Sequence, residues 1–149
     1  MLFRIASLSV LATLLMGSLP VKAQSCIPLL VVDGEHNQII KTISPPGTLV
    51  TDDNWDTSWS IPNDREFRRF FLLFIPSDSS QYHLEVNLAY ENNSTDQFYY
   101  QNDVNLIADQ NLSVLITPQS NQEPMQVNLM VGGLQAIGSS YSASVVGCE

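Results

Sequence analysis

Residues 82–90 read Tyr82-His83-Leu84-Glu85-Val86-Asn87-Leu88-Ala89-Tyr90, and every second residue of this stretch is large and apolar. His83, Glu85 and Asn87 occupy alternate positions between them. Successive side chains of a β-strand point to opposite faces of its sheet, so this spacing predicts a strand with one buried face and one solvent face. Such a strand is typical of an antiparallel sheet that covers a core on one side only.

The same period of two recurs along most of the chain, and no stretch shows the spacing of an amphipathic helix. Turn-forming residues such as Asp33-Gly34 and Gly132-Gly133 separate the apolar stretches. Short strands about ten residues apart predict an all-β fold, an antiparallel β-sandwich of about nine strands, either Ig-like or jelly-roll-like. Besides 82–90, we predict strands near 28–32, 38–43, 55–61, 67–75, 97–101, 104–108, 112–116, 125–131 and 141–148.

One predicted strand is apolar on both faces. Phe70 to Phe74 are five consecutive apolar residues, so neither face of that strand suits water. We therefore expect a central strand that the core buries on one side. A loop or a partner molecule is expected to cover the other side.

The first 23 residues have the features of a cleaved secretory signal peptide. Arg4 precedes an apolar run of roughly fifteen residues, and Val21 and Ala23 form a small-residue cleavage site. The run is shorter than the roughly 20 residues of a membrane-spanning helix, although an uncleaved anchor is the alternative. We predict a signal peptide at 1–23 and one β-sandwich domain at 24–149, secreted or periplasmic and not integral to a membrane.

Two cysteines lie almost at the two ends of the mature chain, and the sequence contains no others. We predict a disulfide between Cys26 and Cys148, which requires their Cα atoms to lie within about 7 Å. The first and last strands must then be neighbours. The alternative is a lipid-modified Cys26, but Ala23 and Gln24 fit a lipoprotein signal poorly.

Charge narrows the classes of partner. Without residues 1–23, four of the six basic residues and all fifteen acidic residues remain, giving a net charge of about −11. This balance argues against a nucleic-acid partner, which needs a basic surface. A glycan or an envelope protein remains as the class of partner, and the oligomeric state is left open.

The densest group of oxygen ligands lies in one predicted loop. Asp52, Asp53, Asn54 and Asp56 fall within five residues, and calcium prefers six to eight oxygen ligands. These four residues are our candidate calcium site, and we expect no other cofactor. The alternative is an Asx-capped turn on an acidic surface.

Two tryptophans and three arginines suggest other sites. Trp55 and Trp59 share a strand face, where they either stack against a sugar ring or pack in the core. Arg65, Arg68 and Arg69 either clamp an anionic ligand or pair with nearby acids such as Asp64 and Glu66.

Catalytic motifs are missing from the sequence. The two histidines, His36 and His83, are far apart in the chain, and no Gly-x-Ser-x-Gly motif is present. We assign no catalytic residue and do not expect an enzyme.

Three stretches resemble small exported bacterial β-sandwich proteins of unknown function: 53–57, 126–128 with 131–133, and 142–145 before Cys148. The resemblance implies a fold and a compartment but no activity. The sequence thus favours a non-enzymatic binding or envelope-associated module. The alternatives are a carbohydrate- or calcium-dependent adhesion module and a small hydrolase that uses carboxylates.

Overall fold

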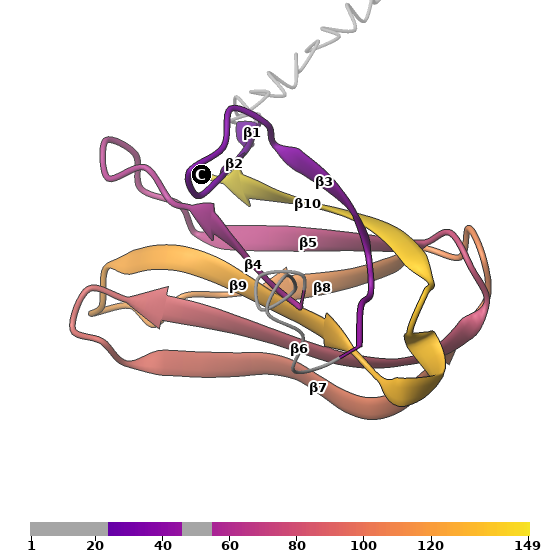
Figure 1. Ribbon diagram of the computed structural model, residues 1–149. Coiled ribbons are helices and arrows are strands. Elements are labelled where there is room, and N and C mark those ends of the chain that lie inside the picture. The colour runs from indigo at the N-terminus through magenta and orange to yellow at the C-terminus, as the bar shows by residue number, and fades with distance from the viewer. Residues whose placement is uncertain (1–23, 46–54) are drawn as a thin grey trace, which may run out of the picture.

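The computed structural model describes residues 24–45 and 55–149, and the predicted signal peptide lies outside them. Within these residues, ten strands form two sheets, with one short 3-10 helix, η1 (Leu134–Ala136). Figure 1 shows the two sheets as two layers. The strands are β1 (Cys26–Pro28), β2 (Leu30–Val31), β3 (Gln38–Thr42), β4 (Asp56–Ser60), β5 (Arg69–Pro76), β6 (Ser80–Tyr90), β7 (Thr95–Leu106), β8 (Leu112–Ile116), β9 (Pro124–Gly132) and β10 (Ser140–Cys148).

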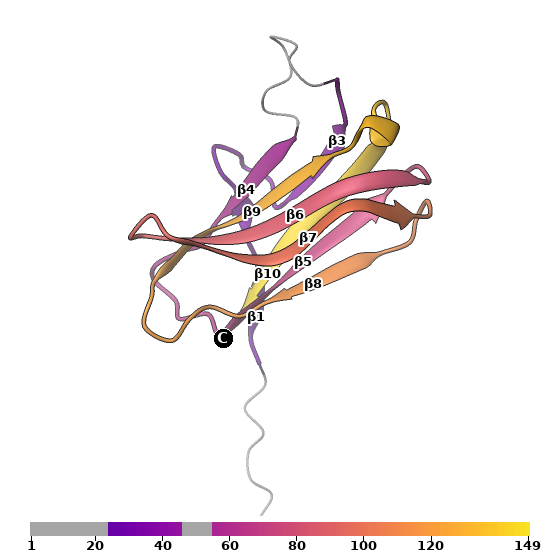
Figure 2. The same cartoon turned by 90° about the horizontal axis from the view of Figure 1, so that it is seen from below.

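The order of the strands is that of a jelly roll. In the first sheet, sheet A, β5 separates β10 from β8, and the far edge of β10 pairs with β1 at one end and β3 at the other. The second sheet, sheet B, runs β2-β4-β9-β6-β7. From β3 onward the chain changes sheets at every connection except the β6–β7 hairpin, which decides between the two sandwich types in favour of the jelly roll. Figure 2 shows the strands of sheet B crossing over those of sheet A.

The core consists of the inward-facing residues of both sheets. The apolar positions of 82–90 are all buried, as their alternation predicted. In β5 the residues at 70, 72 and 74 are fully buried, and the Phe74 ring lies 5.6 Å from that of Tyr82 and 5.1 Å from that of Tyr141. The contact with Tyr82 of β6 joins sheet A to sheet B across the core, whereas Tyr141 of β10 belongs to sheet A.

Two predicted strand boundaries are wrong. The predicted strand at 28–32 is divided between the sheets, because Leu29 turns inward to be buried between β1 and β2. The strands predicted at 97–101 and 104–108 are one continuous strand, β7. The register between β6 and β7 shifts between Tyr82 and Leu84, which pair with Val104 and Gln101. The polar residues around Asn102 therefore form a bulge and not a turn.

The two ends of the domain are held together as predicted. Cys26 and Cys148 form a disulfide with a Cα–Cα distance of 4.1 Å, and they are directly paired in the β1–β10 ladder. The backbone N–H of Glu149 also donates to the carbonyl oxygen of Ser25 (3.0 Å). Figures 1 and 2 both place the C-terminus beside β1. Within residues 24–45 and 55–149, no helix is long and apolar enough to cross a membrane.

The side chains of Lys41 and Tyr141 lie together at one edge of the core. Lys41 Nζ donates to Thr57 Oγ1 (2.8 Å) and to the backbone oxygen of Asp56 (3.0 Å), which links β3 of sheet A to β4 of sheet B. The neighbouring Tyr141 hydroxyl is buried and makes no hydrogen bond of good geometry within the described residues. Burial raises the pKa of Tyr141 well above its usual value; the nearby Thr57 hydroxyl opposes this rise, and the Asp56 charge adds a smaller rise.

Removing the disulfide should destabilise the fold. We expect the Cys26→Ser/Cys148→Ser double variant to lose about 2–5 kcal/mol of unfolding free energy, because the unfolded chain is no longer closed into a large loop. Urea denaturation followed by far-UV circular dichroism measures the change. A Ser113→Ala variant in strand β8 serves as the control, and equal stability of the double variant and the wild type would contradict the prediction.

The Tyr141 hydroxyl should make stability fall at alkaline pH. The unfolded tyrosine ionises near its ordinary pKa of 10.0, whereas the folded group stays neutral, so the folded state loses stability as the pH rises above about 10. Tyr141→Phe should reduce this loss and leave stability at pH 7 unchanged or slightly higher, because it deletes a buried hydroxyl that lacks a partner.

Urea denaturation at pH 7 and at pH 10.5 tests this prediction. Tyr82→Phe is the matched control, since the Tyr82 hydroxyl donates to the backbone oxygen of Asp78 (2.6 Å), and its loss should cost about 1 kcal/mol at pH 7. A Tyr141→Phe variant that is as destabilised as the control would show that the Tyr141 hydroxyl is well bonded.

Candidate functional site

The outer face of sheet B is polar across four neighbouring strands. In the register of the sheet, Ser58 pairs with Asn128, Asn128 with Asn87, and Asn87 with Gln97. In the next row Met130 pairs with Glu85, which pairs with Tyr100. We call this surface the polar face, and its residues are Ser58, His83, Glu85, Asn87, Gln97, Tyr100 and Asn128.

Glu85 lies at the centre of the polar face and orders its neighbours. Its Oε1 accepts a hydrogen bond from Asn87 Nδ2 (2.8 Å) and another from Gln97 Nε2 (3.0 Å). A carboxylate has two acceptor oxygens, and each amide has a second N–H and a carbonyl oxygen. The three side chains therefore fix one another and retain donors and acceptors for a ligand.

An exposed aromatic ring stands beside this cluster. Tyr100 is 47% exposed, and its ring meets that of His83 edge to face with centroids 5.4 Å apart. The Tyr100 hydroxyl donates to Asn102 Oδ1 (2.9 Å). The ring is thus held in place while it faces solvent, which suits it to stack against the apolar side of a ligand.

The polar face also contains an unpaired acceptor. Asn128 Oδ1 is buried and has no hydrogen-bond partner within the described residues. A buried acceptor without a donor costs about 1–3 kcal/mol. A hydrogen-bond donor is therefore missing from the middle of the Ser58–Asn128–Asn87 row.

The two tryptophans do not form a sugar-stacking pair. Trp59 is 0% exposed and donates through Nε1 to the backbone oxygen of Asn37 (3.2 Å), so the stacking hypothesis is wrong for this residue and its alternative, core packing, holds. Trp55 is half-buried, donates to the backbone oxygen of Ser44 (2.9 Å), and lies against Gly132. Its ring occupies the space that a side chain at position 132 would need.

The candidate calcium site falls mostly outside the described residues. Asp52, Asp53 and Asn54 are among the residues that the structure does not describe, so the calcium hypothesis stays a prediction. Asp56 is at the start of β4 and exposed, and its backbone oxygen accepts from Lys41. Among residues 24–45 and 55–149, no three histidine, cysteine or acidic side chains are grouped as a metal site requires.

The arginines lie at one end of the sandwich. Arg65 and Arg68 line a hollow of about 610 Å³ that Glu66, Glu91 and Glu123 also line. Arg65 forms an exposed ion pair with Glu149 (3.2 Å) and not with the sequence neighbours that we named, because the C-terminus lies next to the 61–68 connection. More carboxylates than guanidinium groups surround this hollow, so it does not form an anion clamp.

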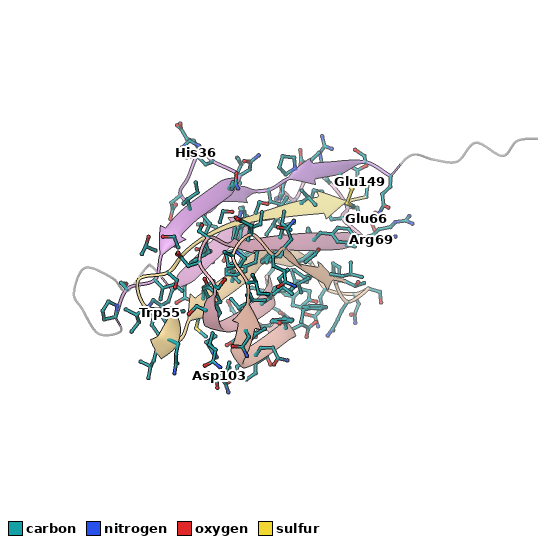
Figure 3. All side chains as sticks on the ribbon, turned by 90° about the vertical axis from the view of Figure 1, so that its right-hand side faces the viewer. His36, Trp55, Glu66, Arg69, Asp103 and Glu149 are labelled. Atoms are coloured by element: carbon teal, nitrogen blue, oxygen red, sulfur yellow. A yellow bond between two sulfur atoms is a disulfide. The ribbon has the colours of Figure 1, made fainter. Side chains whose placement is uncertain are left out.

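The labelled side chains lie at separate places on the molecule. Figure 3 shows Trp55 at the end of the sandwich opposite to Glu66, Arg69 and Glu149, and it shows His36 and Asp103 at opposite edges of the view. His36 is in the connection between β2 and β3, whereas His83 is on the polar face. The structure therefore does not bring the two histidines together.

Most of the polar face could not be predicted from the sequence. The alternation in 82–90 placed His83, Glu85 and Asn87 on the solvent side, which is confirmed, but gave them no role. Gln97 and Tyr100 could not be assigned to the same surface, because a register shift between Val86 and Asn87 changes which residues of β7 face outward.

No protein-family model and no curated protein matches this sequence. One similar solved structure contains the CBM22-1 and GH10 modules of an endo-1,4-beta-D-xylanase from Clostridium thermocellum complexed with xylohexaose, at 7% identity over 83% of this chain, with a TM-score of 0.36. This chain covers 26% of that chain. Another, described as "CBM4 structure and function", shows 11% identity over 78% of this chain and 98% of that chain, also with a TM-score of 0.36. A likeness at this level says nothing about what this chain binds.

Gly132 should be required for the position of Trp55. A Cβ atom at residue 132 would lie 2.3 Å from the Trp55 ring, so Gly132→Ala must displace the indole. We expect a loss of about 1–3 kcal/mol in stability and a red shift of tryptophan fluorescence as Trp55 becomes more exposed. Gly34→Ala is the control, because a Cβ atom there meets its nearest neighbours at an ordinary 3.4 Å. An unchanged emission maximum in Gly132→Ala would contradict the prediction.

Proposed function

We propose that this protein is a secreted or periplasmic, non-catalytic glycan-binding module whose ligand lies on the polar face of sheet B. The observation that carries the proposal is the cluster of Glu85, Asn87 and Gln97 beside the exposed ring of Tyr100. Hydroxyl groups of a sugar both donate and accept hydrogen bonds, and this cluster offers both functions. The apolar side of a pyranose ring matches the Tyr100 ring.

The charge of sheet B supports a neutral ligand. The five strands of this sheet contain no lysine or arginine, whereas they contain Asp56, Glu85, Asp96 and Asp103. Phosphate, sulfate and carboxylate ligands are usually held by arginine or lysine, so this face does not suit them. A neutral polyhydroxylated molecule needs only the amides, hydroxyls and carboxylate that are present.

The dimensions of the polar face favour an oligosaccharide. The row from Ser58 to Gln97 crosses four strands, and neighbouring strands are about 4.8 Å apart, so it is about 14 Å long. It is an open surface at which an extended chain can enter and leave.

The disulfide supports an extracytoplasmic location. Disulfides persist in secreted and periplasmic proteins and are rare in the cytosol. A calcium-dependent form of the proposal involves Asp52, Asp53, Asn54 and Asp56, so the binding measurements are made both with calcium and with EDTA.

Removing the Tyr100 ring should weaken glycan binding. A glycan array identifies the ligand of the wild-type protein, and isothermal titration calorimetry measures its affinity. We expect Tyr100→Ala to weaken binding at least about tenfold, or about 1.4 kcal/mol. Tyr100→Phe should keep most of the affinity, because it retains the ring and loses only the hydrogen bond to Asn102.

Two further measurements make this test decisive. Ile107→Ala is the control, because Ile107 is 65% exposed and lies just beyond the end of β7. Chromatography of the recovered oligosaccharide should show it intact, as a non-catalytic module requires. The proposal fails if no glycan binds the wild type with calcium or with EDTA, or if Tyr100→Ala binds as tightly as the wild type.

A further inference from the structure

The outer face of sheet A is apolar, in contrast to the polar face. Ser142 of β10 pairs with Ile40 on one side and with Ile75 on the other. Further along the sheet, Val146 pairs with Phe71, which pairs with Leu115. We call this surface the apolar face, and its residues are Ile40, Phe71, Leu73, Ile75, Leu115 and Val146.

The described part of the chain leaves this face open to solvent. Ile40 is 80% exposed and Leu115 is 53% exposed, while Phe71 and Leu73 are half-buried in the centre of the sheet. Glu85 and Asn87 have the same degree of burial on the opposite, solvent-facing side of the sandwich. Neighbouring side chains of the same sheet are therefore enough to half-bury a central residue, even where no other segment lies over it.

The apolar face has the shape that a second copy would complement. Ser142 and Ser144 are small outward residues of β10 that pair with the large Ile75 and Leu73 of β5, whereas Phe71 pairs with Val146. In a two-fold dimer each contact occurs twice with the roles exchanged. The large Leu73 and Ile75 of one copy can thus lie over the small serines of the other, and the reverse contact forms at the same time.

Charge also favours a second copy at this face. The five strands of sheet A contain no aspartate or glutamate, although the whole sequence contains fifteen acidic residues and has a net charge of −9. Two copies of an acidic protein repel each other, and the repulsion is weakest where neither presents a carboxylate. An anionic membrane would be repelled by the rest of the molecule.

The area of the face limits the strength of such a dimer. Four strands about 4.8 Å apart and about seven residues long cover about 440 Å² in each copy. Two copies would then bury about 900 Å², close to the lower bound of about 1,000 Å² for specific interfaces. An interface of this size fits a weak, reversible dimer.

We propose that the protein forms a two-fold homodimer in which the apolar faces of two copies pack against each other, with Leu73 and Ile75 of each copy against Ser142 and Ser144 of the other. The polar faces then remain on the outside of the dimer, so the dimer and the glycan site are independent.

Sedimentation velocity on the exported protein from about 1 to 500 µM tests the dimer. The wild type should shift from monomer to dimer within this range. Ile40→Glu and Leu115→Glu each place a carboxylate in the interface at an exposed position that tolerates substitution. We expect each variant to raise the dissociation constant at least about tenfold.

Ile107→Glu is the matched control, because Ile107 is equally apolar and exposed but does not belong to the apolar face, and it should dimerise as the wild type does. Circular dichroism confirms that each variant is folded. A wild type that stays monomeric at 500 µM would overturn the proposal. So would a dimer that survives both glutamate substitutions, since it would have to use another face.

Discussion

Strand β10 must be hydrogen-bonded along both of its edges, and the rest of the structure depends on this requirement. It is buried on its inner face, where an unpaired peptide group would cost a hydrogen bond. Strand β5 pairs with one edge, and β1 and β3 divide the other between them. This division brings the two cysteines into register and directs the chain through Leu29 into the second sheet.

The two sheets separate the charges of the strands. Sheet A contains no acidic residue and sheet B contains no basic residue, although both contribute alternate apolar residues to one core. Because the inner faces are alike, the difference lies in the outer faces. One presents amides, a carboxylate and an aromatic ring, and the other presents aliphatic and aromatic side chains beside serines. The same fold therefore carries two surfaces that suit different kinds of contact.

Alternation along the sequence predicts what is local and misses what depends on pairing between strands. It correctly placed 82–90 with His83, Glu85 and Asn87 outward, and the cysteines correctly predicted that the first and last strands are neighbours. It did not predict that Leu29 divides a strand or that β7 is continuous through its bulges. The burial of Trp55 and Trp59 could not be predicted, because the alternation along a strand does not say how deeply a side chain is buried. Only the contact of Trp55 with Gly132 and the hydrogen bond of Trp59 to Asn37 distinguish their environments.

The position of β10 also determines the order in which the domain can assemble. Strands β6 and β7 are consecutive and pair as a hairpin, so they can associate as soon as both have emerged. In sheet A no two consecutive strands form a hairpin, and β1, β3 and one edge of β5 all pair with β10, which follows them in the chain. Contacts between residues so distant in sequence form slowly. Strand β5 can pair with β8 earlier, but its other edge lacks a partner until the nine residues of β10 have been synthesised.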